Sequence, residues 1–168
     1  MATSSERDAA PGRWPDLAGR IEGRVHRLPV RVYYEDTDFS GYVYHANYVK
    51  FCERGRSDCL RLLGVHHHEL VGTGGHDWTG FVVRRMEADF LKPARIDEVL
   101  EVHTSLAALG RARIVLDQRI LRGEDCLFTA LVTAAVVDRR GRPVRLSAGM
   151  TAALERMHPD GPGVDGEG

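Results

Sequence analysis

The chain has 168 residues, enough for one compact domain with its own core but not comfortably for two. Its hydrophobic content of 43% and charged content of 28% are those of an ordinary globular protein, and its net charge of -1 gives no basic field to attract nucleic acid, so no nucleic-acid partner is expected. No apolar run approaches the roughly 20 residues of a membrane-spanning helix, so stable membrane insertion is not expected.

The two ends of the chain differ in composition from its middle. Residues 1–24 contain prolines and glycines that interrupt any long helix, and we expect a flexible N-terminal extension there. Residues 158–168 are rich in Gly and Pro and have almost nothing to bury, which predicts a disordered C-terminal tail. The folded domain is therefore expected over residues 25–157.

The cysteines and histidines give little support for a metal site. Cys52, Cys59 and Cys126 form no Cys-x-x-Cys pair, and the adjacent histidines 66–68 do not converge easily on one ion. The odd cysteine count favours reduced thiols, and residues 1–11 lack the apolar segment of a secretory signal. The chain is therefore expected to be cytoplasmic and free of bound metal.

The first predicted strand covers Val30 to Glu35, where apolar side chains recur at every second position. Asp36 and Asp38 follow at once, then a turn at Gly41 and the start of a helix. This order brings a carboxylate, a bend and a helix N-terminus close together. Carbonyl chemistry uses such parts, namely an acid or base and backbone N–H groups aimed at a developing oxyanion.

A long helix is predicted from Asn47 to Leu63, because apolar residues recur there at helical spacing and Gly64 follows as a stop signal. Four more strands are expected, with short turns that favour antiparallel pairing, and Ser147 is expected to cap a last short helix through Glu155. These strands cover Phe81 to Leu91, Asp97 to Ala108, Arg111 to Leu121 and Cys126 to Asp138.

Together the elements predict an α+β fold of the hotdog type. A curved antiparallel sheet of about five strands wraps around one long central helix, because each then buries the apolar face of the other. The first strand joins a meander formed by the other four. A free sheet edge invites pairing with a second copy, so we expect a homodimer or a homotetramer.

An ordered set of motifs spans most of the expected domain. It consists of Val30-Arg31-Val32-Tyr33-Tyr34-Glu35-Asp36-Thr37-Asp38, Gly41, Val43-Tyr44-His45-Ala46-Asn47-Tyr48, Phe51-x-Glu53-Arg54-x-Arg56, Phe81-Val82-Val83-Arg84-Arg85-Met86 and Pro93-Ala94-Arg95-x-Asp97. The set resembles the 4-hydroxybenzoyl-CoA thioesterase family, and most of all its YbgC-type acyl-CoA thioesterases, which are associated with the Tol–Pal system. The sequence departs from that subfamily at Phe39, Ser40 and Tyr42, where smaller residues are common; this bears on acyl-chain preference.

The resemblance implies hydrolysis of acyl-CoA to a carboxylic acid and free CoA, without metal or cofactor, and it makes Asp38 the catalytic carboxylate. Asp38 would act as general base on water or attack the thioester directly. From local sequence alone, it is equally a turn residue that bonds backbone N–H groups. His45 is the second candidate catalytic residue, which would polarise the carbonyl or hold the leaving sulfur; the alternative is a packing or capping histidine.

Substrate-binding roles are expected around these two groups. Free backbone N–H groups at the helix start would donate to the substrate, with a second contribution from the backbone near Gly80. Two tyrosines would line or support the acyl pocket, and two arginines flank the turn where this family grips the CoA phosphates, although an exposed charged strand is the alternative. The predicted substrate-binding residues are Tyr44, Ala46, Asn47, Tyr48, Gly80, Phe81, Arg111 and Arg113.

Three functional hypotheses follow. The preferred one is an acyl-CoA thioesterase, for which acyl carrier protein is the alternative carrier of the acyl group. The second is a non-catalytic module that binds acyl-CoA or acyl carrier protein in lipid or envelope metabolism. The third is a hotdog hydratase or dehydratase, which would act on the β-carbon and release no thiol.

Overall fold

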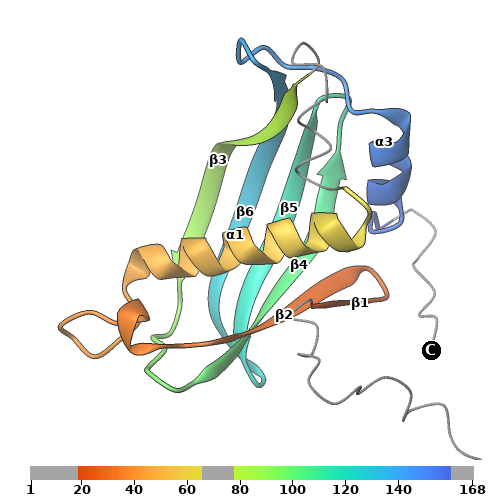
Figure 1. Cartoon of the computed structure of the whole chain (residues 1–168). Coiled ribbons are helices and arrows are strands. Elements are labelled where there is room, and N and C mark those ends of the chain that lie inside the picture. Colours follow the sequence, from red (N-terminus) through yellow and green to blue (C-terminus); the bar gives the residue numbers. More distant parts are fainter. Residues whose placement is uncertain (1–18, 66–77, 160–168) are drawn as a thin grey trace, which may run out of the picture.

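The computed structural model describes residues 19–65 and 78–159. They form a six-stranded antiparallel sheet in the order β1-β2-β4-β5-β6-β3, and helix α1 crosses one face of it (Figure 1). No helix in these ranges is long and apolar enough to cross a membrane. The strands are β1 (Arg20–Glu22), β2 (Val25–Arg31), β3 (Thr79–Phe90), β4 (Val99–Leu109), β5 (Arg113–Arg122) and β6 (Asp125–Asp138). The helical segments are η1 (Tyr34–Asp36, a 3-10 turn), α1 (His45–Leu62) and α3 (Ala148–Glu155).

The inner face of the sheet and the apolar stripe of α1 bury each other. Along β4 and β5 every second residue is buried, as expected for strands with one face packed against a helix. On α1, Phe51 and Cys52 are fully buried in one apolar cluster with Val102 and Phe128. Gly55 permits a close approach of helix and sheet, because a Cβ at this position would lie 2.7 Å from Cγ1 of Val102.

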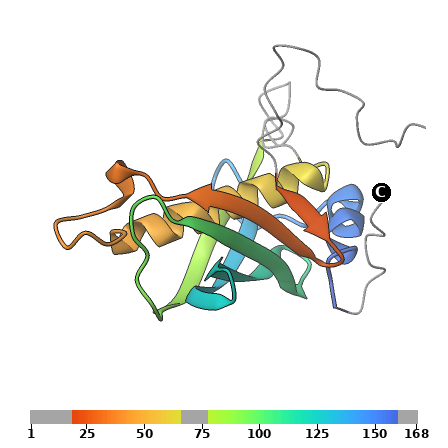
Figure 2. The ribbon, with the colours of Figure 1, turned by 90° about the horizontal axis from the view of Figure 1, so that it is seen from below.

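Helix α3 closes the core at the other end of α1. Ser147 caps it by accepting a hydrogen bond from the N–H of Met150 at 3.2 Å, so the predicted cap is confirmed. Leu154 of α3 packs with Leu60 and Leu63 in a second apolar cluster. Accordingly, α3 lies beside the C-terminal end of α1 in both views (Figures 1 and 2).

The beginning of the sheet differs from the prediction. Strand β2 covers Val25–Arg31 rather than Val30 to Glu35, and the chain then turns into η1, where the carboxylate of Asp36 accepts a hydrogen bond from the N–H of Tyr33 at 2.8 Å. Such local side-chain bonds compete with strand pairing. Strand β1 pairs with β2, so the sheet has six strands rather than about five, and it begins within the segment 1–24 that we expected to be an extension.

The position of strand β3 also differs from the prediction. It pairs with β6 at the edge of the sheet, whereas β4 lies between β2 and β5, so a meander of four consecutive strands is wrong. Residues 91–98 connect β3 to β4 and are longer than the loops of about two to five residues that join hairpin strands. This connection runs to β4 at the end of the sheet that holds the start of α1 (Figure 1).

A buried polar cluster lies under the second half of α1. The carboxylate of Asp58, which is 4% exposed, contacts Nε2 of the fully buried His26 at 2.7 Å and accepts the N–H of Gly19 at 2.7 Å. It also pairs with Arg61. Burial lowers the pKa of His26 despite the neighbouring carboxylate, so its imidazole is neutral and donates through Nε2. Asp58 therefore ties the first two strands to the helix.

Candidate active site

The loop between η1 and α1 forms a tight hairpin that projects beyond the start of α1 (Figures 1 and 2). The N–H of Asp38 donates to the carbonyl of Tyr42 at 3.0 Å, and the N–H of Gly41 donates to the carbonyl of Asp38 at 3.0 Å. Gly41 has a φ of +79°, a left-handed conformation that favours glycine. The predicted turn at Gly41 is confirmed, and Asp38 is the residue at which this turn begins.

The side chain of Asp38 is exposed and ionised. Its Oδ1 accepts hydrogen bonds from the hydroxyl of Ser40 at 2.5 Å and from the N–H of Ser40 at 2.8 Å. These two bonds, with a smaller contribution from the nearby His45, hold the pKa of Asp38 below its ordinary value. The carboxylate therefore bonds a backbone N–H, as a turn residue does, and at the same time presents a negative charge to solvent close to His45.

Asp36 and Asn47 fix the loop to the start of α1. The carbonyl of Asp36 accepts the N–H of Tyr44 at 2.9 Å and the side-chain amide of Asn47 at 2.9 Å. The N–H of Asn47 donates to the carbonyl of Tyr44 at 2.8 Å, so the prediction that this N–H is free at the helix start is wrong. Asn47 is buried and holds the backbone in place, whereas His45 and Ala46 stand in the first turn without helical acceptors.

A shallow depression of about 290 Å³ opens beside the start of α1. The ring of His45 lies on one side of it, 6.2 Å from the half-exposed ring of Phe90 at the end of β3. The buried Tyr48 forms the floor: its ring stacks on Phe128 at 5.5 Å, and its hydroxyl accepts the N–H of Ala94 at 2.9 Å. The depression is lined by Val43, His45, Tyr48, Phe90, Leu91, Lys92 and Pro93.

Tyr44 and Tyr48 occupy different surroundings. Tyr48 supports the depression from within, and burial raises the pKa of its hydroxyl, so it stays protonated. Tyr44 is 45% exposed, and its ring lies 4.4 Å from that of His45. Phe90 was not predicted as a site residue, because its approach to His45 depends on β3 lying at the sheet edge. Its only sequence signal is an aromatic residue at the end of a strand.

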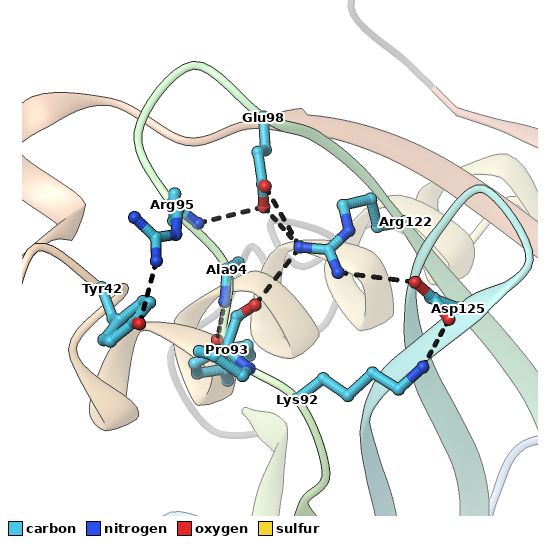
Figure 3. Close-up of polar contacts among 9 residues, drawn as sticks. Tyr42, Lys92, Pro93, Ala94, Arg95, Glu98, Arg122 and Asp125 are labelled. Carbon is cyan, nitrogen blue, oxygen red and sulfur yellow. Dashed lines mark hydrogen bonds and ion pairs between the residues drawn. The ribbon is translucent and has the colours of Figure 1, made fainter.

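A network of charged side chains holds the wall of the depression (Figure 3). Arg122 donates through one nitrogen to both carboxylate oxygens of Glu98, at 3.0 and 3.1 Å, and to the carbonyl of Pro93 at 3.3 Å. Arg95 donates to the hydroxyl of Tyr42 at 2.9 Å, and its guanidinium lies 4.7 Å from the centre of that ring. The network thus joins the β3–β4 connection to the strand β5 and to the loop that carries Asp38.

We expect Arg122→Leu to lower the catalytic efficiency several-fold and the free energy of unfolding by about 0.5–1 kcal/mol, the usual range for exposed ion pairs. The reason is that the β3–β4 connection loses its anchor on β5. Arg119→Leu is the matched control, because Arg119 pairs with Asp117 on its own strand and does not touch the connection. Equal kcat/KM values for the two variants would contradict the role assigned to Arg122.

The other predicted site residues lie at the opposite end of the sheet. Gly80 is the second residue of β3 and pairs with Val137. It lies ten residues before Phe90, which corresponds to roughly 30 Å along a strand. Phe81 is next to Gly80, and Arg113 pairs with Ala135 on the same stretch of β6. Arg111 and Arg113 lie at the β4–β5 turn. Arg111 lines a separate open hollow there, together with Arg145. One chain therefore holds two separated groups of predicted site residues.

The described residues contain no group of three or more His, Cys, Asp or Glu side chains placed to hold a metal ion. The histidines at positions 66–68 lie outside the described residues.

Comparison with known proteins gives consistent matches. A family model described as thioesterase superfamily matches residues 40–128. The chain is 43% identical over 115 residues to the acyl-CoA thioester hydrolase YbgC of Escherichia coli O6:H1, covering 68% of this chain and 83% of that protein. It is 37% identical over 131 residues to the acyl-CoA thioesterase YbgC of Haemophilus influenzae, covering 77% of this chain and 94% of that protein. A solved structure of a probable thioesterase from Bartonella henselae is 46% identical, with a TM-score of 0.69 over 73% of this chain and 99% of that chain.

Proposed function

The chain belongs to the thioesterase superfamily, and from this premise we propose that it is an acyl-CoA thioesterase, which hydrolyses acyl-CoA to a carboxylic acid and free CoA. Its six-stranded antiparallel sheet is that of a hotdog thioesterase fold. The observation that carries the proposal is the ionised, exposed carboxylate of Asp38 close to His45, whose side chain lines a mainly apolar depression. A thioester carbonyl needs little more than an activated water and a stabilised oxyanion.

In this proposal Asp38 activates the water, and the start of α1 stabilises the oxyanion. In the general-base route, a water oxygen bonds to the carbonyl carbon while one proton passes to Asp38; the C–S bond then breaks and that proton passes to the CoA sulfur. The N–H groups of His45 and Ala46, which lie in the first turn of α1, and the His45 side chain would stabilise the developing oxyanion.

Direct attack by Asp38 through a mixed anhydride is the other route. In that route an Asp38 oxygen bonds to the carbonyl carbon as the C–S bond breaks, and water then cleaves the anhydride. Label in the Asp38 carboxylate after a single turnover in ¹⁸O-labelled water would establish this route with attack of water at the Asp38 carbonyl, and trapping of the anhydride with hydroxylamine would detect it when water attacks the acyl carbon instead.

The identity of the acyl carrier follows from a direct comparison of substrates. We expect the chain to release thiol from acyl-CoA, as the names of its YbgC relatives state for those proteins. The test compares kcat/KM for the same acyl group on CoA and on acyl carrier protein, over short, long and aromatic acyl groups. Turnover restricted to acyl carrier protein would overturn the CoA assignment while leaving thioester hydrolysis in place.

A homodimer would bring the two separated groups of site residues together. Strand β3 is one of the two edge strands of the sheet, and Val83 on it is 49% exposed. If two β3 edges pair antiparallel about a two-fold axis at Arg85, Gly80 of one copy comes close to Phe90 of the other, because paired residue numbers have a constant sum apart from the one-residue irregularity between Val83 and Arg85. The backbone near Gly80, together with Arg111 and Arg113, would then serve the Asp38 site of the other copy. A tetramer is two such dimers.

We expect the protein to sediment as a dimer or tetramer, and Val83→Glu to yield inactive monomers. In the pairing centred on Arg85, position 83 faces Glu87 of the other copy, so the substitution places like charges opposite each other. Val99→Glu is the control, since Val99 is equally exposed at 49% but lies on β4, inside the sheet. A fully active monomer would contradict the proposal.

The cellular setting extends the same proposal. The resemblance to YbgC-type proteins supports a cytoplasmic thioesterase that works with the Tol–Pal envelope system. Fractionation of cells that produce the tagged protein tests the location. Co-purification with Tol–Pal components tests the association.

A further inference from the structure

Ser40 makes contacts that bear directly on the candidate catalytic group. It is one of the positions at which the sequence departs from the YbgC-type pattern. Its hydroxyl lies 2.5 Å from Oδ1 of Asp38, and its own N–H donates to the same oxygen at 2.8 Å. Two donors of one residue thus converge on one oxygen atom of the carboxylate.

The direction of the hydroxyl proton is fixed by its neighbours. The N–H of Tyr42 donates to the hydroxyl oxygen of Ser40 at 3.3 Å, and an ionised carboxylate only accepts hydrogen bonds. The O–H of Ser40 therefore points at Oδ1 of Asp38. Within residues 19–65 and 78–159, Oδ2 of Asp38 receives no hydrogen bond, so the two oxygens of this carboxylate are not equivalent.

We propose that Ser40 is a positioning residue, which anchors Oδ1 of Asp38 and so presents Oδ2 as the oxygen that reacts. This inference depends on the proposed role of Asp38. A carboxylate on an exposed loop samples several rotamers, and anchoring one oxygen removes that freedom before the substrate arrives. The Ser40 hydroxyl also supplies the largest contribution to the lowered pKa of Asp38, which keeps the group ionised in mildly acidic solution.

The test measures kcat, KM and the pH dependence of kcat/KM for Ser40→Ala and Ser40→Thr. We expect Ser40→Ala to lower kcat roughly tenfold with little change in KM, because positioning is lost rather than binding. The acidic limb of the kcat/KM pH profile of this variant should move to higher pH, because the pKa of Asp38 rises when a hydrogen-bond donor to its charged form is removed. Ser40→Thr keeps the hydroxyl and should restore both properties.

Ser105→Ala is the control, since Ser105 bonds the carbonyl of Asp117 on the sheet and lies far along β4 from the loop. If Ser40→Ala keeps the wild-type kcat and the wild-type acidic limb of the pH profile while Asp38→Asn is inactive, the positioning role of Ser40 is wrong. The proposed role of Asp38 would stand in that case.

A double mutant gives an independent readout. If Ser40 acts through Asp38, then Ser40→Ala should cause no further loss of rate in an Asp38→Asn background. A further tenfold loss in that background would show that Ser40 acts separately and would refute the inference. Wild-type activity of Asp38→Asn itself would refute both the inference and the proposed role of Asp38.

Discussion

Asp38→Asn is expected to lower kcat by about 10²- to 10⁴-fold, the usual contribution of a positioned acid or base. Asparagine has nearly the same shape, and its carbonyl oxygen can still accept the two hydrogen bonds from Ser40. A neutral amide, however, cannot take a proton from water and is a poor nucleophile. Thiol release from an acyl-CoA substrate measures the loss of rate directly.

The fold should not change in this variant, because the Asp38 side chain is exposed and contributes nothing to the core. The thermal unfolding curve should therefore match that of the wild type. Asp117→Asn is the matched control, since the Asp117 carboxylate pairs with Arg119 on β5 and does not line the depression. If the folded Asp38→Asn protein turns over like the control, the catalytic assignment is wrong.

The second large effect concerns stability. Asp58→Ala is expected to lower the free energy of unfolding by about 3 kcal/mol, the scale for removing one partner from a buried charged cluster. The substitution leaves His26 fully buried without its Nε2 partner, and among the described residues its Nδ1 already has none. It also removes the acceptor for the N–H of Gly19.

Urea unfolding of Asp58→Ala beside Glu124→Ala measures this loss, because Glu124 is exposed in the β5–β6 turn. The folded fraction of Asp58→Ala should keep its kcat, since Asp58 is nearly four turns of helix from the start of α1, or about 20 Å along its axis. A destabilisation no larger than that of the control would contradict the structural role of the cluster.

Local sequence signals predicted the elements whose contacts are local. The apolar spacing placed the main helix within two residues of its observed ends, His45 and Leu62, and the hydroxyl of Ser147 marked the start of α3. The proximity of Asp38 and His45 was also predictable, because only a short turn separates them. Their chemical roles remain predictions.

Long-range contacts set the features that the sequence pattern missed. An alternating strand pattern does not specify its partner, so the pairing of β3 with β6 instead of β4 was not predictable. Phe90 reaches His45 only through that pairing, and the anchoring of the β3–β4 connection depends on Arg122, which is distant in sequence. The end of β2 was missed because Asp36 closes a turn where the apolar alternation still continues.

Thioester hydrolysis by this chain is tested most directly by the quantity of each product that the wild-type protein releases from one acyl-CoA substrate. We expect one free thiol and one carboxylic acid for each acyl-CoA consumed, without added metal or cofactor, and almost none of either with Asp38→Asn. Binding of acyl-CoA without thiol release, or hydration of an enoyl-CoA with the thioester intact, would contradict it.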